Sequence, residues 1–386
     1  MEHQVYADKE YDNLIKPIMI VTKIASFWPL ERDHSTSMKL FKICHVLFLV
    51  ALFTIMCTVI IADIIHHLND LDELTACALT ACAFFLDIIR LIVFSTHQKD
   101  MSYVVETMRK DWTCSVHENR AILKEKCLFA FWVSKCFITM VTVTIIIFAC
   151  SPILETYFHG KERIFPYRGY FFANQTVSPY YEYIYIFNIM GGLFGCSLIC
   201  GATTFNFIVV THGSAKFAVL RKNLEAINSN NSDANIAMVN CIKEHQDVIA
   251  FADALERIIN VLALAQFILS TGLFCFAGFQ ITSLLQDKHR LMQYTMFLNS
   301  AILELFMFSI SGNALIDESD AVGESAYCSR WFGGTFGRNL QIVMMRSKVP
   351  SKITAAKFYS MSLRSFSQVL STSFSYIMVL LSVSEN

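Results

Sequence analysis

Charged residues and proline are scarce in this sequence. Only 16% of the 386 residues are Asp, Glu, Lys or Arg, whereas a soluble domain carries about 25%. Lys and Arg total 31 and Asp and Glu total 32, so there is no basic excess of the kind that binds nucleic acid. Six prolines and fourteen glycines exclude collagen-like and disordered chains. Apolar residues make up 54% of the chain and the mean hydropathy is +0.46, which predicts a membrane protein.

The sequence also lacks the residue spacings that mark catalytic, redox or metal sites. Its thirteen cysteines form no C-x-x-C pair, and most lie in apolar runs as small buried side chains. His66 and His67 are adjacent, so their side chains do not face one site on a helix. Segment 333–337 lacks the lysine of a phosphate-binding loop. We therefore expect no enzymatic activity, no metal and no cofactor.

Seven apolar runs are long enough to cross a bilayer as helices, which takes about 20 residues each. They are too long and too continuously apolar for the strands of a membrane barrel. The sequence therefore predicts an all-α membrane protein with seven transmembrane helices. The runs cover residues 43–65, 74–95, 127–149, 183–210, 258–283, 291–313 and 356–383.

The distribution of Lys and Arg among the loops predicts the orientation in the membrane. The amino-terminal segment and every second loop after it carry 22 of these residues, whereas the alternate loops carry 5. This bias places the N-terminus in the cytoplasm and the C-terminus outside, opposite to a G-protein-coupled receptor. Asn174 lies in an Asn-Gln-Thr glycosylation sequence on the outer side. Asn230 lies in a similar sequence on the inner side, so we expect it to be unmodified.

The seventh run is unusually polar, with eight serines and one threonine between residues 360 and 382. At about 100° per residue, one side of this helix carries a polar stripe that ends in two valines toward the outside. Such a stripe is typical of a water-filled cavity, and a ring of valines from several subunits closes a pore by dewetting. Serines that only hydrogen-bond a neighbouring helix are the alternative. The stripe consists of Gln368, Thr372, Ser375, Val379 and Val383.

The outer halves of the second, third, fourth and sixth runs are apolar and aromatic, with a few hydroxyl or amide groups and almost no charge. A cavity among them suits a small neutral organic molecule held by one or two hydrogen bonds. The nearby segment 157–187 is rich in aromatic residues, which include Tyr167. Some of them belong to the interfacial belt of any membrane protein, and the others are expected to roof this cavity. The candidate ligand-binding residues are Cys77, Thr80, Phe84, Met140, Thr144, Phe148, Tyr183, Phe187, Met190, Tyr294, Phe297 and Asn299.

Four charged residues within the runs require partners, because an unpaired charge in a membrane is costly. Asp87 and Arg90 are three residues apart and are expected to pair on one helix face. Lys135 and Glu304 are expected to pair between the third and sixth helices. We favour a structural role for these charges over an ion path.

Segment boundaries follow the changes from apolar to polar composition. The Asn- and Ser-rich stretch 228–235 predicts a break between two helical extensions, which form either a subunit-binding region or a solvated hairpin. The expected segments are a cytoplasmic N-terminal segment (1–42), helices one to four (43–210) with an extracellular loop (150–182), cytoplasmic anchor extensions (211–257), helices five and six (258–313), a cytoplasmic anchor segment (314–355) and a pore-lining seventh helix (356–386).

The carboxyl end resembles the signature of insect odorant receptors. The run Thr372-Ser373-Phe374-Ser375-Tyr376 is similar to the Ser-Tyr-Ser-aromatic stretch of that family. The positions that carry the likeness are Tyr327, Trp331, Arg346, Pro350, Phe358 and Phe366, together with the Pro166-Tyr167 and Ser178-Pro179-Tyr180-Tyr181 loop, His212, Cys241 and His245.

This resemblance implies a subunit of an odorant-gated, poorly selective cation channel in the plasma membrane of olfactory neuron dendrites. Four subunits would surround one pore, with tuning subunits joined to a coreceptor through an intracellular anchor to give a heterotetramer. The ligand would be a small neutral organic odorant bound among helices two, three, four and six. Val379 and Val383 would occupy the positions of the hydrophobic gate.

The short loop between helices four and five favours a tuning subunit, because the coreceptor has a longer one. Gustatory receptors usually end with a Thr-Tyr and Gln-Phe pattern that this chain lacks, so a gustatory-type channel is the second interpretation. A transporter is the third, although internal repeats and broken helices, which would support it, are not evident.

Overall fold

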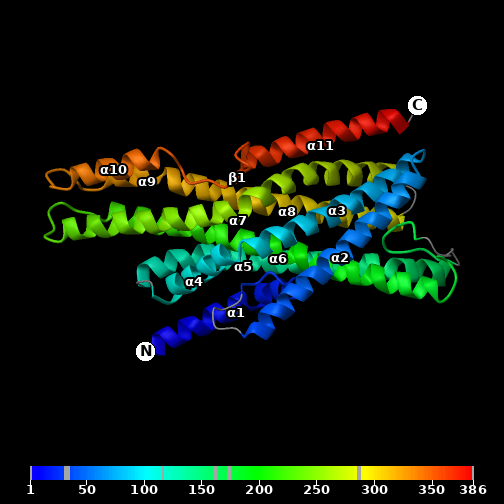
Figure 1. The fold of residues 1–386 in the computed structure, drawn as a ribbon. Coiled ribbons are helices and arrows are strands. Elements are labelled where there is room, and N and C mark those ends of the chain that lie inside the picture. Colours follow the sequence, from blue (N-terminus) through cyan, green and yellow to red (C-terminus); the bar gives the residue numbers. More distant parts are fainter. Residues whose placement is uncertain are drawn as a thin grey trace.

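The computed structural model describes residues 2–29, 35–114, 117–159, 163–171, 175–284 and 288–384. Within these ranges the chain is almost entirely helical (Figure 1). The helices are α1 (Glu2–Ile24), α2 (Thr36–His66), α3 (Leu71–Thr96), α4 (Gln98–Cys114), α5 (His117–His159), α6 (Tyr180–Glu225), α7 (Ala234–Ser283), α8 (Lys288–Asp320), α9 (Val322–Cys328), α10 (Gly337–Ser347) and α11 (Leu363–Ser384). Two short strands of two residues each, β1 (Thr354–Ala355) and β2 (Tyr359–Ser360), pair as an antiparallel hairpin.

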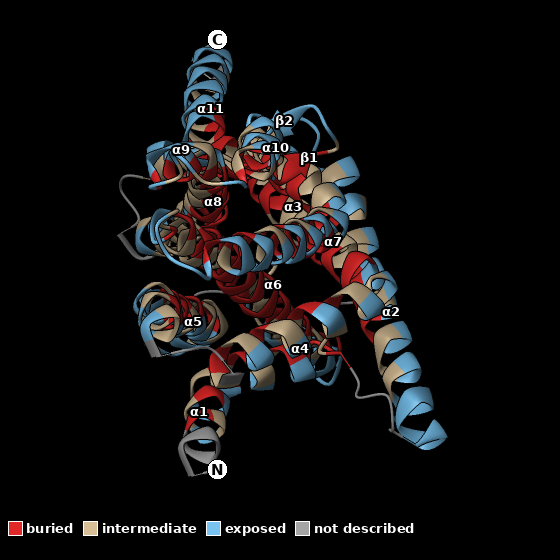
Figure 2. Cartoon of the chain, turned by 90° about the vertical axis from the view of Figure 1, so that its left-hand side faces the viewer, coloured by how far each residue is buried: buried red, intermediate tan, exposed pale blue. Residues whose placement is uncertain are grey.

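Seven of these helices are long and apolar enough to span a bilayer: α2, α3, α5, α6, α7, α8 and α11. The prediction of seven transmembrane helices is confirmed, and six of the helices contain a whole apolar run of the sequence. The exception is α11, which begins at Leu363 rather than at residue 356, because the chain before it forms the β1–β2 hairpin. Helix α6 forms the centre of the bundle, where it packs against α5, α7 and α8. Figure 2 shows it as the most deeply buried helix, and 78% of its most apolar stretch is buried.

Helix α11 lies at the edge of the bundle and contacts only α7 and α8 closely (Figures 1 and 2). Only 6% of its most apolar stretch is buried. A spanning helix with so little contact to its own chain has a surface available for lipid, for another subunit or for a pore.

Helices α6 and α7 continue without interruption beyond the apolar runs that they contain. Helix α6 ends at Glu225 and α7 begins at Ala234, so the Asn- and Ser-rich stretch forms the predicted break. Short helices α9 and α10 pack beside this end of α6 and α7. Backbone hydrogen bonds from Ser229 to Arg330 (2.8 Å) and from Arg330 to Ile227 (3.1 Å) connect the break to the segment after α9. The helical extensions and α9–α10 therefore form one packed unit.

Candidate ligand pocket and pore helix

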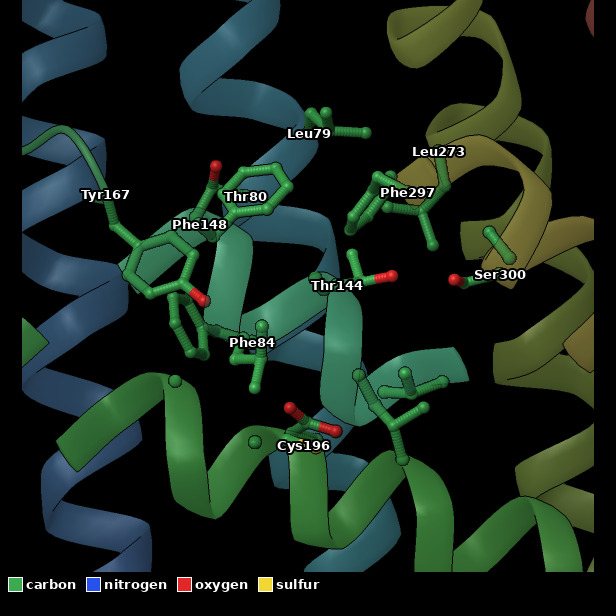
Figure 3. A pocket seen from close by; sticks show the side chains of 18 of the residues that line it. Leu79, Thr80, Phe84, Thr144, Phe148, Tyr167, Cys196, Leu273, Phe297 and Ser300 are labelled. Carbon is green, nitrogen blue, oxygen red and sulfur yellow. The ribbon is translucent and has the colours of Figure 1, made fainter. Parts of the chain in front are cut away.

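A cavity of about 140 Å³ lies among α3, α5, α6, α7 and α8 (Figure 3). The loop 163–171 reaches the cavity from the end where α5 and α6 are joined. The walls are almost wholly apolar or aromatic. These wall residues are Ala76, Leu79, Ala83, Phe84, Leu86, Val141, Ile145, Phe148, Pro166, Tyr167, Gly192, Gly195, Cys196, Ile199, Leu273, Tyr294, Phe297 and Ala301.

Four aromatic rings enclose one side of this cavity. The Tyr167 ring lies edge-on to Phe84 with 5.4 Å between ring centroids and stacks on Phe148 at 6.3 Å. Phe148 in turn lies 6.5 Å from Phe297. Tyr167 comes from the loop, and its hydroxyl lies close enough to Gly192 that a Cβ there would be 2.9 Å away. The loop residue therefore completes an aromatic wall that the helices alone leave open.

Three Ser and Thr residues line the cavity. Thr80, Thr144 and Ser300 each donate a hydrogen bond to a carbonyl of their own helix, at 3.1, 3.0 and 2.9 Å respectively. Figure 3 shows the hydroxyls of Thr144 and Ser300 pointing toward one another across the cavity. Because their protons are used by the backbone, these oxygens offer lone pairs to a ligand.

Charged residues form one end of the cavity, which corrects the expectation of a pocket almost without charge. Asp87, Arg90 and Glu304 all line it and are almost fully buried. Arg90 Nη1 donates to Asp87 Oδ1 at 2.9 Å, as the sequence predicts. Arg90 Nη2 pairs with Glu304 and also donates to Gln266 Oε1 at 2.9 Å. The predicted Lys135–Glu304 pair is wrong, because Lys135 is exposed and Glu304 binds Arg90 instead.

The cavity brings together half of the twelve ligand-binding residues proposed from the sequence. The six that line it are Thr80, Phe84, Thr144, Phe148, Tyr294 and Phe297, and the six that do not are Cys77, Met140, Tyr183, Phe187, Met190 and Asn299. Tyr183 and Asn299 are exposed on the outer faces of their helices. Cys77 is buried, and its thiol donates to Asp63 Oδ2 at 3.2 Å.

Several lining residues were missed by the sequence argument. Two of them, Ser300 and Glu304, follow the candidate Phe297 at successive spacings of three and four residues. They therefore share its helix face, and helical periodicity could have identified them. Tyr167 is one of the loop aromatics expected to roof the cavity, and it lines the cavity. A loop has no periodicity, so the sequence did not tell which of these rings would face inward.

A larger cavity of about 530 Å³ adjoins the first and shares Ala76, Phe148, Pro166, Arg168 and Tyr294 with it. Its walls carry charges of both signs, and Arg168 forms an ion pair with Glu73 between the two cavities. A polar vestibule thus lies next to the apolar pocket.

The stripe of α11 faces away from the bundle. Gln368, Thr372, Ser375, Val379 and Val383 are all exposed, and the two valines are each 58% exposed. The opposite side of the helix packs against α7. There, the hydroxyl of the buried Ser373 reaches the carbonyl of Thr271 at 3.2 Å, and Ile377 covers Gly278, where a Cβ would have no room. Asn174, the proposed glycosylation site, lies outside the described residues.

Comparison with known proteins identifies the family. The sequence model described as 7tm odorant receptor matches residues 70–374, which is more than half of the chain. The chain belongs to this odorant receptor family. The receptor is 24% identical to Odorant receptor 13a of Drosophila melanogaster, over 97% of this chain and 96% of the relative. It is 22% identical to Odorant receptor 10 of Aedes albopictus, over 94% and 97% of the two chains.

The receptor is also similar to the odorant receptor coreceptor of Aedes aegypti, with 30% identity over 36% of this chain and 30% of the relative. Among solved structures, the insect olfactory receptor OR5 from Machilis hrabei in complex with eugenol has the same fold. The TM-score is 0.85 at 14% identity, and the match covers 97% of this chain and 99% of that one.

Ion pairs tie together the helices of this odorant receptor away from the pocket. Asp111 in α4 accepts hydrogen bonds from His212 (3.0 Å) and Lys216 (2.6 Å) in α6. Burial alone would raise the pKa of Asp111, but His212 and Lys216 outweigh it and hold the pKa below its usual value. Glu318 similarly binds Arg221 at 2.7 Å and Lys126. No group of metal-binding residues occurs in the part of the receptor that the structure describes.

Proposed function

We propose that this receptor is the odorant-binding tuning subunit of a ligand-gated, non-selective cation channel. The observation that carries the proposal is an enclosed aromatic cavity in a bundle whose polar-striped helix α11 is left uncovered. A single chain thus contains a site for a small organic molecule and a helix suited to line a pore. The ligand is a small, mostly apolar volatile, and the match to an OR5 structure that holds eugenol supports this class.

The ligand-binding residues of the proposal are the pocket-lining six, Thr80, Phe84, Thr144, Phe148, Tyr294 and Phe297. Their rings and hydroxyls recognise a ligand by shape and by one or two hydrogen bonds.

The pore is formed by α11 from several subunits around an axis. Gln368, Thr372 and Ser375 line its wetted part, and Val379 and Val383 close it by dewetting in the resting state. Ligand opens the channel because it binds the open arrangement more tightly than the closed one.

The partner is an odorant coreceptor, and the likeness to coreceptors supports this assignment. The complex is a heterotetramer joined through the unit formed by the extensions of α6 and α7 with α9 and α10. Large apolar side chains exposed on α9 and α10 and in the segments that follow them support a contact between subunits here. They are Tyr327, Phe332, Ile342, Met345 and Val349.

The receptor is a multi-pass membrane protein, and we place it in the plasma membrane of olfactory neuron dendrites. The loop charge bias sets the N-terminus and the anchor unit in the cytoplasm and the C-terminus outside. Asn174 is then glycosylated on the outer side. Loss of one glycan from the receptor on Asn174→Gln, with no change on Asn230→Gln, would support this orientation, whereas the reverse result would contradict it.

Whole-cell current recording tests the function directly. Cells that express this receptor with a coreceptor are exposed to a panel of volatiles, beside cells that express either chain alone, with surface labelling of every chain. We expect a volatile-evoked, non-selective cation current that requires both chains. A pair that reaches the surface and stays silent to the whole panel, or a response that the coreceptor gives equally by itself, would contradict the proposal.

A further inference from the structure

The two carboxylates at the charged end of the cavity each have one oxygen engaged. Asp87 Oδ1 accepts from Arg90 Nη1 at 2.9 Å. Glu304 Oε1 accepts from Thr203 Oγ1 at 2.8 Å and from Arg90 Nη2. Within the described ranges, no hydrogen bond reaches the second oxygens, Asp87 Oδ2 and Glu304 Oε2. Neither of these two oxygens is sealed from free space.

Gly195 lies directly beside Asp87 Oδ2 at the wall of the cavity. Gly195 and Asp87 both line the cavity, and a Cβ at Gly195 would lie 3.0 Å from Oδ2. Any side chain at this position of α6 would cover the oxygen. Glycine therefore leaves a carboxylate oxygen uncovered in a pocket whose walls are mostly apolar.

The Ser and Thr hydroxyls of the cavity are also acceptors toward a ligand, whereas the lining groups that can donate are Arg168, which pairs with Glu73, and the hydroxyls of Tyr167 and Tyr294. The hydroxyl protons of Thr80, Thr144 and Ser300 are used by helix carbonyls, so only their lone pairs face a ligand. Arg90 Nε–H has no partner among the described residues, but it is sealed from free space and a ligand cannot reach it. Two carboxylates against one guanidinium leave this end of the cavity rich in negative charge.

We propose that this end of the cavity selects odorants that carry a hydrogen-bond donor, an alcohol, phenol or amine group on an apolar body, with Asp87 and Glu304 as the acceptors. The inference rests on the proposed function and specifies its ligand class. A buried acceptor without a donor is costly, and a charged acceptor more so. A ligand that offers only acceptors, such as an ether or a ketone, leaves the carboxylates unpaired. It also places the lone pairs of its oxygen against those of the carboxylate oxygens, which repel them. Sites built this way reject analogues that lack the donor.

Matched ligands test this selection in the unmodified receptor. Dose–response currents are recorded from the receptor and coreceptor pair with primary alcohols, primary amines, methyl ethers and methyl ketones of equal chain length. We expect the donor-bearing compounds to act at concentrations about 10–100-fold lower than the ethers and ketones. Comparison of the responses to the alcohols and to the amines shows whether the site prefers a neutral or a cationic donor. Ethers or ketones that act equally well, or better, would overturn the inference while leaving the channel function intact, whereas silence toward every volatile would defeat both.

Two substitutions distinguish ligand contact from a structural role of the charges. Glu304→Gln replaces an acceptor by an amide that also donates, so the alcohol-to-ether ratio of half-maximal concentrations should move toward one. Thr203→Val is the matched control, because Thr203 binds the same carboxylate but does not line the cavity, and it should keep the ratio of the unmodified receptor. An equal change of the ratio in both variants would show a structural role only. If Glu304→Gln does not reach the surface, Asp87→Asn takes its place, and the comparison of ligands in the unmodified receptor remains decisive.

Discussion

Ser373 in the proposed pore helix contacts Thr271 in α7, because the serine hydroxyl lies 3.2 Å from the threonine carbonyl and shares its proton between this oxygen and the carbonyl of Val369 in its own helix, at 2.8 Å. The same α7 carries Gln266, which accepts a hydrogen bond from Arg90 at the charged end of the ligand cavity. Gln266 also donates to Ser270, one residue before Thr271. Helix α7 thus contacts the pocket and the pore helix within about one and a half turns, and it is the element best placed to transmit ligand binding to the gate.

Removing the hydroxyl of Ser373 should weaken this transmission. Ser373→Ala loses one buried hydrogen bond, worth about 0.5–1.5 kcal/mol, so we expect the half-maximal odorant concentration to change by about 2–12-fold. Dose–response currents with a fixed odorant measure the change. Ser367→Ala is the control, because this exposed serine of α11 bonds only to its own helix, at the carbonyl of Arg364 (3.0 Å). Equal shifts in the two variants would argue against transmission through α7.

The valine pair of α11 provides a test of the gate. Val379→Ala shortens an exposed apolar side chain on the striped face, so the dewetted barrier should weaken and current without odorant should rise several-fold. Met378→Ala changes a neighbour that is also exposed but points about 100° away, and it should leave the basal current unchanged. If Val379→Ala keeps the unmodified basal current and ion selectivity, these valines do not line the constriction.

Much of this fold could be predicted from hydropathy, because spanning helices need long apolar runs. The break between α6 and α7 followed from Asn and Ser, whose side chains compete with helical hydrogen bonds. The five residues of the α11 stripe are exposed together, since helical periodicity fixes which residues share a face within one element.

The pocket could be predicted only in part. Which side of each helix is turned toward its neighbours depends on tertiary packing, and the sequence alone does not reveal that packing. Glu304 and Lys135 lie in neighbouring spans, but Lys135 faces outward and Glu304 binds Arg90 instead. Both residues lie in spanning helices, as expected, but the sequence did not show which way each side chain faces around its helix axis. The aromatic loop was expected to roof the cavity, and Tyr167 lines it, but tertiary contacts alone decide which ring of the loop enters the bundle.

The size of the pocket can be tested at Gly192. A Cβ at this position would lie 2.9 Å from the Tyr167 hydroxyl and 3.4 Å from Ile145, so Gly192→Ala should push the aromatic wall into the cavity. Overpacking of this kind costs about 1–3 kcal/mol, and we expect half-maximal concentrations of bulky odorants to rise about tenfold, with a smaller effect for short ones. Gly337→Ala is the control because no atom lies within 4 Å of its added Cβ. A uniform effect on odorants of all sizes would indicate a general defect.

The ion pairs of Asp111 predict a pH-dependent stability. Its pKa is held below the usual value in the folded receptor, so its stabilising contribution is complete above the unfolded pKa of about 4 and is lost as the pH falls through the folded pKa. At neutral pH, Asp111→Asn removes a charge that binds both His212 and Lys216, and we expect a loss of about 1–3 kcal/mol. Melting of the purified receptor in detergent measures it, and the difference from the unmodified receptor should shrink as the pH is lowered. Asp12→Asn is the control, because the pair of Asp12 with Arg109 is exposed and contributes little. A difference that stays constant with pH would contradict the assignment to charge.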